Sequence, residues 1–237
     1  MFTKSILFSV MMLFSAYIGA QIPSSTRSKA VLKKQTAILS KSLNENSLKI
    51  GNAIFIRIFK ESKELELWMQ KTGSKEYRLF KTYEICTYGS KGLGPKLKEG
   101  DQIAPEGFYY VPKTKMNPNS EYHLAFNLGF PNSYDLAHGR TGSLLMVHGN
   151  CVSIGCFAMT DPAIEEIYTL AHYAFENGQA YFRVHCFPFR MTEKNLQAHQ
   201  LSEWYNFWKN LKEGYDYFEK NKFPPNVNVQ GKRYIFK

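Results

Sequence analysis

The sequence predicts an α+β fold that is mainly β, a sheet-built sandwich or barrel with accessory helices. Short apolar runs separated by Gly- and Pro-rich turns recur from about residue 53 to residue 150, which is typical of consecutive strands. Beyond residue 159 the apolar residues take helical spacing instead. The 237 residues are 44% hydrophobic and 15% aromatic, so the chain can bury a sizeable core, and a disordered or low-complexity chain is excluded.

Three strands open the predicted sheet. Residues 53–59 and 65–69 are apolar runs with a short turn between them, and residues 77–86 continue as the third strand. The Gly- and Pro-rich residues 89–101 are predicted to form a loop, and residues 107–112 the next strand. This order indicates a β-meander at the start of the fold.

Two helices and a closing strand are predicted after the run of strands. Asp161 suits the N-cap of the first helix, Pro162 its first position and Gly178 its end. Residues 180–185 are predicted as the closing strand. Residues 195–217 are predicted as the second helix, whose apolar face consists of Leu196, Leu201, Trp204, Phe207, Trp208 and Leu211.

The sequence predicts four segments. Residues 1–20 form an export signal and residues 21–50 a linker or short helix. Residues 51–192 form the main domain, and residues 193–237 a C-terminal helix with a tail that packs on that domain. Lys4, an apolar run and the small residues Gly19-Ala20 predict a secretory signal peptide, with an uncleaved membrane anchor as the alternative. No other stretch of the sequence reaches the ~20 apolar residues of a membrane span. We expect an exported protein of the periplasm or cell envelope that meets the membrane only through its N-terminal segment, if that is retained. The tail around Pro224 is predicted as an extended strap or frayed end.

The basic excess lies at the two ends of the chain. The formal net charge is +10, a balance that suits nucleic acid, an anionic membrane or an acidic polymer. Without residues 1–20 the excess is +9 over 21–100, −3 over 101–190 and +3 over 191–237. A nucleic-acid enzyme concentrates positive charge along its working cleft, whereas the most reactive segment of this chain lies in the mildly acidic middle. We therefore expect no nucleic-acid partner.

Residues 146–156 hold the densest collection of reactive side chains, including His148, Cys151 and Cys156. A thiol has an ordinary pKa of about 8.5 and is mostly protonated at neutral pH, so an adjacent imidazole is needed to produce the attacking thiolate. Two alternatives stay open, a zinc site and cysteines that are merely buried or disulfide-bonded. Zinc is disfavoured because the chain has no Cys-x-x-Cys or His-x(3–5)-His spacing. The residues favour a Cys/His active site with no metal and no organic cofactor.

His148-Gly149 followed by Ser153-Ile154-Gly155-Cys156 resembles the active-site signature of the L,D-transpeptidase catalytic domain, the YkuD superfamily. Residues from His148 to Thr160 are more similar still to the YafK-type subgroup. The pattern of that subgroup is His-Gly, a short spacer and then Ser-x-Gly-Cys-x-Ala-Met-Thr. Further agreement spans about residues 50–192, and includes Arg57-Ile58-Phe59-Lys60, Leu93-Gly94-Pro95-Lys96, Glu99-Gly100-Asp101 and His138-Gly139-Arg140. The resemblance implies an L,D-transpeptidase-like fold for the main domain.

The resemblance also implies a reaction on peptidoglycan stem peptides. Cys156 would attack a carbonyl at an L-configured centre, His148 would act as base and then acid, and backbone amides of Gly155 and Cys156 would hold the oxyanion. Transfer of the thioester to an amine makes a cross-link, whereas transfer to water detaches a peptide or a peptidoglycan-linked protein. Ile154 stands where many members have a second His, so a wall-binding protein with a degenerate site is the remaining alternative.

Several other residues are candidates for the site. Ser153 is a candidate orienter of His148, with local backbone bonding as the alternative. The candidate substrate-binding residues are Gly149, Arg140, His138, Asn132, Tyr134 and Asp135. Arg140 is the preferred partner for a substrate carboxylate because a guanidinium binds a carboxylate bidentately, with a structural salt bridge as the alternative.

The remaining cysteines, histidines and tryptophans are expected to be structural. Cys86 and Cys186 are the proposed disulfide in an oxidising compartment, which leaves Cys151 as a thiol, although sequence alone does not fix connectivity. The other histidines are expected to be structural or exposed, and the tryptophans to pack in the core: His123, His172, His185 and His199, and Trp68, Trp204 and Trp208.

Overall fold

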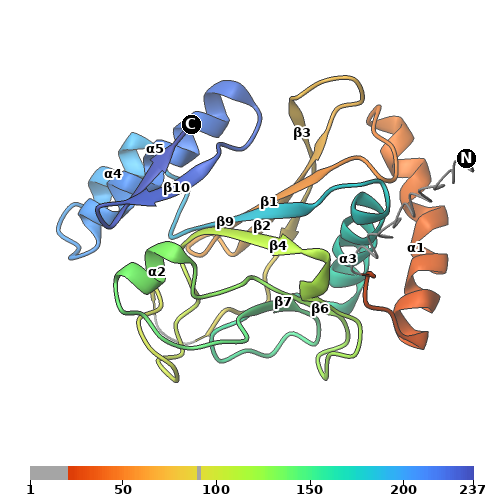
Figure 1. Ribbon diagram of the computed structural model, residues 1–237, viewed down its shortest axis with the longest axis horizontal. Helices are drawn as coiled ribbons and strands as arrows, with labels where there is room; N and C mark the ends of the chain where they lie inside the picture. Colours follow the sequence, from red (N-terminus) through yellow and green to blue (C-terminus); the bar gives the residue numbers. More distant parts are fainter. Residues whose placement is uncertain (1–20, 90–91) are drawn as a thin grey trace, which may run out of the picture.

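The computed structural model describes residues 21–89 and 92–237, so the predicted signal peptide lies outside the described residues. Two sheets form the body of the protein (Figure 1). The larger has the strand order β3-β2-β1-β9-β4, and its members are β1 Ile54–Phe59, β2 Glu64–Gln70, β3 Tyr77–Glu84, β4 Gly107–Pro112 and β9 Tyr181–Phe187. The smaller has the order β5-β6-β7-β8, with β5 Met116–Asn117, β6 Ala125–Asn127, β7 Met146–His148 and β8 Phe157–Ala158. The predicted α+β class is confirmed, but the expectation of a mainly β chain is not, because more of the described residues lie in α-helices than in strands.

The three predicted opening strands form the expected antiparallel meander, β1 with β2 and β2 with β3. The strand expected to close the fold instead lies inside the sheet, because β9 pairs in parallel with β1 and antiparallel with β4. All six side chains of β1 are buried, as expected for a strand with both faces covered. Alternate residues explain this burial, since Ile56 and Ile58 belong to the core shared with the smaller sheet and Phe59 to a second core on the other face.

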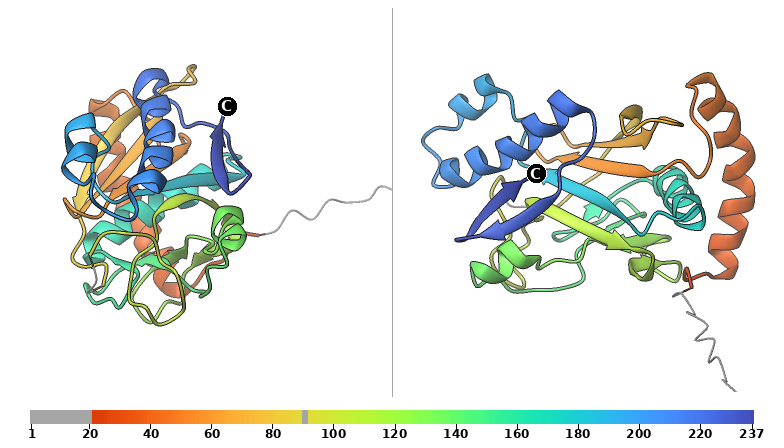
Figure 2. Two further views of the ribbon diagram at one scale, coloured as in Figure 1. Left: turned by 90° about the vertical axis from the view of Figure 1, so that its left-hand side faces the viewer. Right: turned by 45° about the horizontal axis from the view of Figure 1, so that its top comes forward.

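Two helices pack against each other at one end of the molecule, α1 Thr26–Glu45 and α3 Asp161–Glu176 (Figures 1 and 2). Ser25 caps α1, because its hydroxyl accepts from the amide of Ser28 at 3.1 Å. Leu39 and Leu43 of α1 lie in the core shared by the two sheets, so the segment predicted as a linker or short helix is a packed part of the fold. The predicted helix after residue 159 is present, but its N-cap is Thr160 rather than Asp161.

The C-terminal segment covers the opposite face of the larger sheet. The single helix predicted over 195–217 is wrong, because the chain forms α4 Glu193–Ala198 and α5 Tyr205–Asn221 with a turn between them. Leu201, expected on the apolar face, lies in that turn and is 97% exposed. The turn brings two rings onto Phe189, with centroid distances of 4.5 Å for His199 and 5.3 Å for Trp208.

The tail is a hairpin rather than an extended strap. Strands β10 Val227–Gln230 and β11 Arg233–Phe236 pair with each other, and Tyr234 of β11 joins the second core with Trp208 and Leu211 of α5. Two short helices complete the fold, η1 Lys113–Lys115 and α2 Ser133–Ala137. Figure 2 shows the segment with α4, α5 and the hairpin at the opposite end of the molecule from α1. Among the described residues, no helix is long and apolar enough to cross a membrane.

Candidate active site

The sequence motif lies between the last two strands of the smaller sheet. His148 ends β7 and Cys156 immediately precedes β8, and the two strands run parallel with His148 opposite Ala158. Parallel neighbours usually need a connection of a dozen or more residues, but residues 149–156 suffice in this loop. Left-handed conformations at Asn150 and Cys151, with φ of 66° and 46°, make the reversal. The short loop therefore holds the two ends of the motif at one place in the fold.

The ring of His148 is buried and its tautomer is fixed by its own loop. Nδ1 lies 2.7 Å from the carbonyl oxygen of Gly149, and because a carbonyl only accepts, Nδ1 must donate. The lone pair is then on Nε2, where a general base needs it. Burial lowers the pKa of His148, and the bond to Gly149 opposes this only in part, so the imidazole is neutral at neutral pH. The ring of Tyr122 lies against it, with 4.7 Å between centroids.

The sulfur of Cys156 lies against the backbone that leads into β7. Sγ accepts from the amide of Met146 at 3.5 Å and donates to the carbonyl of Leu144 at 3.7 Å. Within residues 21–89 and 92–237, no hydrogen bond joins Sγ directly to the His148 ring. Burial raises the pKa of the thiol, while the Met146 amide and the charge of Lys96 oppose the rise. The resting pair is therefore a neutral thiol and a neutral imidazole.

Cys156 lines a cavity of about 530 Å³. Lys96 and Glu99, from the loop before β4, supply opposite charges to its wall. Leu144 and Ile154 form an apolar rim, since they line the same cavity and are 65% and 81% exposed. The thiol thus faces a solvent-accessible space with an apolar rim and one charged side.

Ser153 bonds the backbone of its own turn. Its hydroxyl donates to the carbonyl of Cys156 at 2.7 Å and accepts from the amide of Gly155 at 3.0 Å. This is the local bonding that the sequence left as the alternative to a bond with His148. The expectation that the Gly155 amide faces an oxyanion is also corrected, because Ser153 already occupies that amide.

The position of Gly149 requires a glycine because of the packing around it, and not because a substrate approaches its backbone. A Cβ on Gly149 would lie 2.5 Å from a carboxylate oxygen of Asp161 and 3.1 Å from Ile164, both in the first turn of α3. Asp161 also accepts from the amide of Asn150 at 2.8 Å. The start of α3 therefore supports the motif loop from behind, and Gly149 does not line the cavity beside Cys156.

The disulfide proposed between Cys86 and Cys186 is wrong, since Cys86 is bonded to Cys151. Cys186 lies in β9, which is separated from β3 by β2 and β1, so its strand is roughly 14 Å from β3 at the usual strand spacing. A disulfide needs Cα atoms within about 7 Å, and the Cα atoms of Cys86 and Cys151 are 5.2 Å apart. The bond ties the end of β3 to the loop that carries the motif. Cys156 and Cys186 are free, and Cys186 is buried.

The five candidate substrate residues of the segment 132–140 form a separate cluster away from the Cys156 cavity. Arg140 is buried and donates to the carboxylate of Asp135 at 2.7 Å. The amide side chain of Asn132 donates to the carbonyl of Phe108 and to the Tyr234 hydroxyl, each at 2.9 Å. Burial raises the pKa of Asp135, although Arg140 and the amide of Asn132 oppose the rise.

The two rings of this cluster complete its packing. Tyr134 stacks between His138 and Tyr234, each with 4.3 Å between centroids. His138 reaches the carbonyl of Lys232 at 3.0 Å. These contacts attach α2 to the C-terminal hairpin, and none of the five residues lines the Cys156 cavity. The salt-bridge alternative for Arg140 is therefore the one that the structure contains.

The remaining histidines and the tryptophans have structural contacts. His123 pairs with Glu165, His172 with Glu176 and His199 with Glu61. His185 is buried between aromatic rings. Trp208 is 2% exposed and Trp68 and Trp204 are half-buried, in keeping with their predicted packing role.

Sequence reasoning missed Lys96, Tyr122 and Met146 as parts of the site. Lys96 stands in a segment that carries the family resemblance, but no motif gives it a role. Tyr122 contributes a ring, and Met146 only its backbone amide, which no residue type reveals. Among the described residues, no group of three or more His, Cys, Asp or Glu is placed to hold a metal ion.

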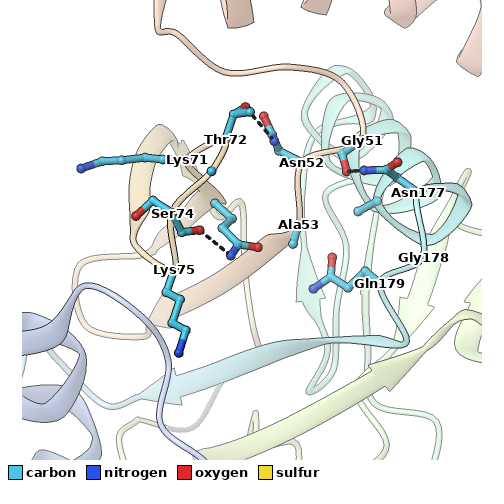
Figure 3. Close-up of a pocket in the computed structure, with 13 residues that line it drawn as sticks. Gly51, Asn52, Ala53, Lys71, Thr72, Ser74, Lys75, Asn177, Gly178 and Gln179 are labelled. Atoms are coloured by element: carbon cyan, nitrogen blue, oxygen red, sulfur yellow. Dashed lines mark hydrogen bonds between the residues drawn. The ribbon is translucent and has the colours of Figure 1, made fainter.

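A second hollow, of about 600 Å³, lies where the turn between β2 and β3 meets the segments that enter β1 and β9 (Figure 3). Its polar side chains bind the surrounding loops: Asn177 donates to the carbonyl of Gly51 at 2.9 Å and Asn52 to the hydroxyl of Thr72 at 3.4 Å. The residues that line it include no Cys, His, Asp or Glu. The Cys156 cavity therefore remains the candidate site.

No family model matches the chain. YafK of Escherichia coli K12 and YafK of Escherichia coli O157:H7, whose names assign them to the L,D-transpeptidases, are each 47% identical to it over 186 residues. The alignment covers 78% of this chain and 74% of each relative. The chain belongs to the YafK family of L,D-transpeptidases. The YafK resemblance seen in the motif is thereby confirmed.

The solved structures that match the chain are more distant from it in sequence. The helical cell shape determining protein Pgp2 of Campylobacter jejuni matches at 19% identity and a TM-score of 0.46, over 80% of this chain and 79% of that chain. A variant of Pgp2 matches at a TM-score of 0.47 over 83% of this chain and 66% of that chain. Bd1075 of Bdellovibrio bacteriovorus matches at 16% identity and a TM-score of 0.42, over 76% of this chain and 78% of that chain.

Proposed function

We propose that this YafK-family protein is a cysteine acyltransferase that acts on peptidoglycan stem peptides. The observation that carries the proposal is the state of its four cysteines. Cys86 and Cys151 are bonded to each other, Cys186 is buried, and Cys156 alone combines a free thiol with a place on the wall of a cavity. His148, with Nε2 unprotonated, belongs to the strand beside it.

The first half-reaction forms a thioester. The Cys156 thiol turns from the Leu144 carbonyl, passes its proton to Nε2 of His148, and its sulfur attacks the carbonyl carbon at an L-configured centre. The carbonyl π electrons move to oxygen, and the backbone amide of Cys156 stabilises that oxyanion. When the tetrahedral intermediate collapses, the C–N bond breaks and the imidazolium of His148 protonates the departing amine. The amide of Met146, which already donates to Sγ, stabilises the thiolate during the transfer.

The second half-reaction releases the acyl group. An acceptor amine that attacks the thioester restores the thiol and leaves a new amide, which is a cross-link or an exchange. Water in the same position yields a carboxylate and detaches a peptide or a peptidoglycan-linked protein. The exposed rim at Leu144 and Ile154 leaves the thioester accessible both to water and to an acceptor amine. Which of the two reacts is therefore decided by how well the acceptor binds.

An envelope location agrees with this substrate. A disulfide such as Cys86–Cys151 persists in an oxidising compartment, and the N-terminal segment was predicted from sequence as an export signal. We propose export to the periplasm or cell envelope, with no metal or organic cofactor in the reaction.

The test is mass spectrometry of purified peptidoglycan, both sacculi and muropeptides, after incubation with the wild-type protein and with Cys156→Ala. New cross-linked or exchanged stems made only by the wild type support transpeptidation, and released peptides or protein without new cross-links support hydrolysis. Labelling with a carbapenem provides a second readout, because an acylated Cys156 identifies the nucleophile. If neither protein changes the substrate and no adduct forms, the wall-binding alternative replaces the proposal.

A further inference from the structure

The wall of the Cys156 cavity carries an ammonium group that is held in place. Nζ of Lys96 donates to the carboxylate of Asp101 at 2.6 Å and to the carbonyl of Lys98 at 3.0 Å. The side chain of Lys96 is 5% exposed and that of Asp101 9%. An ammonium has three N–H donors, so these two bonds leave one donor for a group in the cavity that Lys96 lines.

Asp101 organises the loop that presents this ammonium. One carboxylate oxygen accepts from the amides of Leu97 and Lys98 at 2.8 Å and 3.0 Å, and the other accepts from the amide of Ile103 at 3.1 Å in addition to Lys96. Burial acts to raise the pKa of Asp101, but the bonds from Lys96 and from these amides outweigh it and hold the pKa below its usual range. The Asp101 side chain therefore stays ionised, and its four hydrogen bonds leave the loop little freedom to move the Lys96 ammonium.

The stem of Lys96 is also confined by the turn at Gly142. A Cβ on Gly142 would lie 3.0 Å from Cε of Lys96, and Gly142 has φ of +121°. The amide of Thr141 donates to the carbonyl of Leu97 at 3.0 Å, which joins the two segments. Lys96 therefore sits in a slot between the 96–103 loop and the 141–142 turn. Such a preorganised cation gives more binding energy per hydrogen bond than a flexible surface lysine.

We propose that Lys96 binds a free carboxylate of the acyl-donor peptide when that peptide occupies the Cys156 cavity. The chemistry of the remaining donor favours an anion, because a charge-assisted hydrogen bond is shorter and stronger than a neutral one. The sequence assigned this role to Arg140, but Asp135 already occupies that guanidinium. Among the described residues that line this cavity, Lys96 is the cation that shares it with the thiol. The proposal rests on the proposed function for the identity of the donor, and Glu99 on the same wall disfavours a second carboxylate beside it.

The first experiment needs no peptidoglycan. Iodoacetate and iodoacetamide alkylate the same thiol, but only iodoacetate brings a carboxylate into the cavity. We expect the rate ratio of iodoacetate to iodoacetamide at Cys156 to fall about tenfold in Lys96→Met, the size of one charge-assisted hydrogen bond. Lys98→Met is the matched control, because it removes the same charge from an exposed side chain two residues away, and it should leave the ratio unchanged.

Two further variants guard against a disordered loop. Lys96→Met leaves Asp101 unpaired, so Lys96→Met with Asp101→Asn removes both charges together and should show the same fall in the ratio. Lys96→Arg keeps the positive charge, so this variant should retain most of the wild-type ratio of iodoacetate to iodoacetamide rates. An unchanged ratio in both methionine variants overturns the proposal, and so does an equal fall in Lys98→Met. Equal slowing with both reagents also overturns it, because Lys96 would then stabilise the thiolate rather than bind a carboxylate.

The second experiment uses stem tetrapeptides in which one free carboxylate at a time is converted to its amide. For the wild type, one of these amidated peptides should be a poorer substrate than the unmodified peptide, mainly through a higher KM. The size of this loss should equal the loss that Lys96→Met shows on the unmodified peptide. Lys96→Met should lose nothing further on that amide, as expected for two changes that remove one interaction. Loss of all turnover in Cys156→Ala tests the proposed function separately, so the two failures are distinguishable.

Discussion

The ammonium of Lys60 donates to the carboxylate of Glu106 at 2.9 Å in a place where neither side chain is exposed to solvent. Lys60 also donates to the carbonyls of Gly94 and Ala104 at 2.7 Å and 3.1 Å. Both carbonyls belong to the loop whose middle part carries Lys96 into the Cys156 cavity. The ion pair therefore fixes both ends of one cavity wall to the larger sheet.

Replacement of Lys60 by Met should lower the free energy of unfolding by about 3–5 kcal/mol, because the Glu106 carboxylate is left buried and uncompensated. Replacement of both residues, Lys60→Met with Glu106→Gln, should lose less than the single variant. Urea unfolding followed by tryptophan fluorescence measures both. Equal losses in the single and double variants would show that the charge on Glu106 is not what destabilises the protein.

Removal of the disulfide by Cys86→Ser with Cys151→Ser should lower the free energy of unfolding by about 2–4 kcal/mol, because a bond across 65 residues no longer restricts the unfolded chain. The double variant should also turn over peptidoglycan more slowly, since the loop that carries the motif loses its covalent tie to β3. A non-reduced peptide digest provides the direct check. It should contain a Cys86–Cys151 peptide pair, and a Cys86–Cys186 pair would contradict the structure.

The pH profile of kcat/KM should show a broad plateau around neutral pH. The proposed mechanism needs neutral His148, and burial lowers the pKa of this ring, so activity should persist below the ordinary imidazole value of 6.5 and fall as the pH drops through the lowered pKa. The thiol pKa is raised by burial, so the rate of simple alkylation of Cys156 should keep rising above pH 9.0. His148→Gln should abolish turnover and its acid limb while alkylation at high pH continues. An alkylation rate that is level from pH 6 upward would instead indicate a preformed thiolate.

His185 should make the protein sensitive to acid. Burial between Phe55 and Phe108, together with the charges of Arg183 and Arg57, holds its pKa well below 6.5. Neither ring nitrogen has a hydrogen-bond partner among the described residues. The unfolded chain binds a proton near pH 6.5 that the folded state does not, so stability is complete above that pH and is lost as the pH falls below it.

The expected slope is about 1.4 kcal/mol per pH unit for this residue. His185→Phe should flatten the dependence of the unfolding free energy on pH between 6.5 and 5, with Lys98→Met as a surface control that leaves it unchanged. An identical slope in wild type and His185→Phe would mean that other groups dominate the acid response.

Much of the fold follows from local patterns. The strands of the meander and the helix after Thr160 were predictable because their apolar spacing is set by neighbours in the chain. The central place of β9 was not, because its pairing with β1 joins residues more than a hundred positions apart. The turn at Leu201 was also not predictable, since Leu201 continues the helical spacing of Trp204 and Trp208 in the sequence.

The candidate site divides in the same way. Cys156 and His148 were predictable because thiol and imidazole are rare and stand in a recognisable motif. The role of Arg140 was not, because the sequence shows a guanidinium but not the buried Asp135 that occupies it. The disulfide partner of Cys86 depended on strand order, and Lys96 on the approach of two loops. Both are properties of the folded chain rather than of any segment.

The bond from Trp208 to Glu106, 2.8 Å between Nε1 and the second carboxylate oxygen, has a practical meaning for protein engineering. A Cβ on Gly94 would lie 2.7 Å from Nε1 of Trp204, so the residues before and within α5 meet the same loop twice. A shortened protein that stops at residue 192 keeps every motif residue, yet it opens the interior at Glu106 to water and frees the loop that bears Lys96. The last 45 residues, 193–237, are therefore an integral part of the folded domain, and a shortened version of this protein has to retain them.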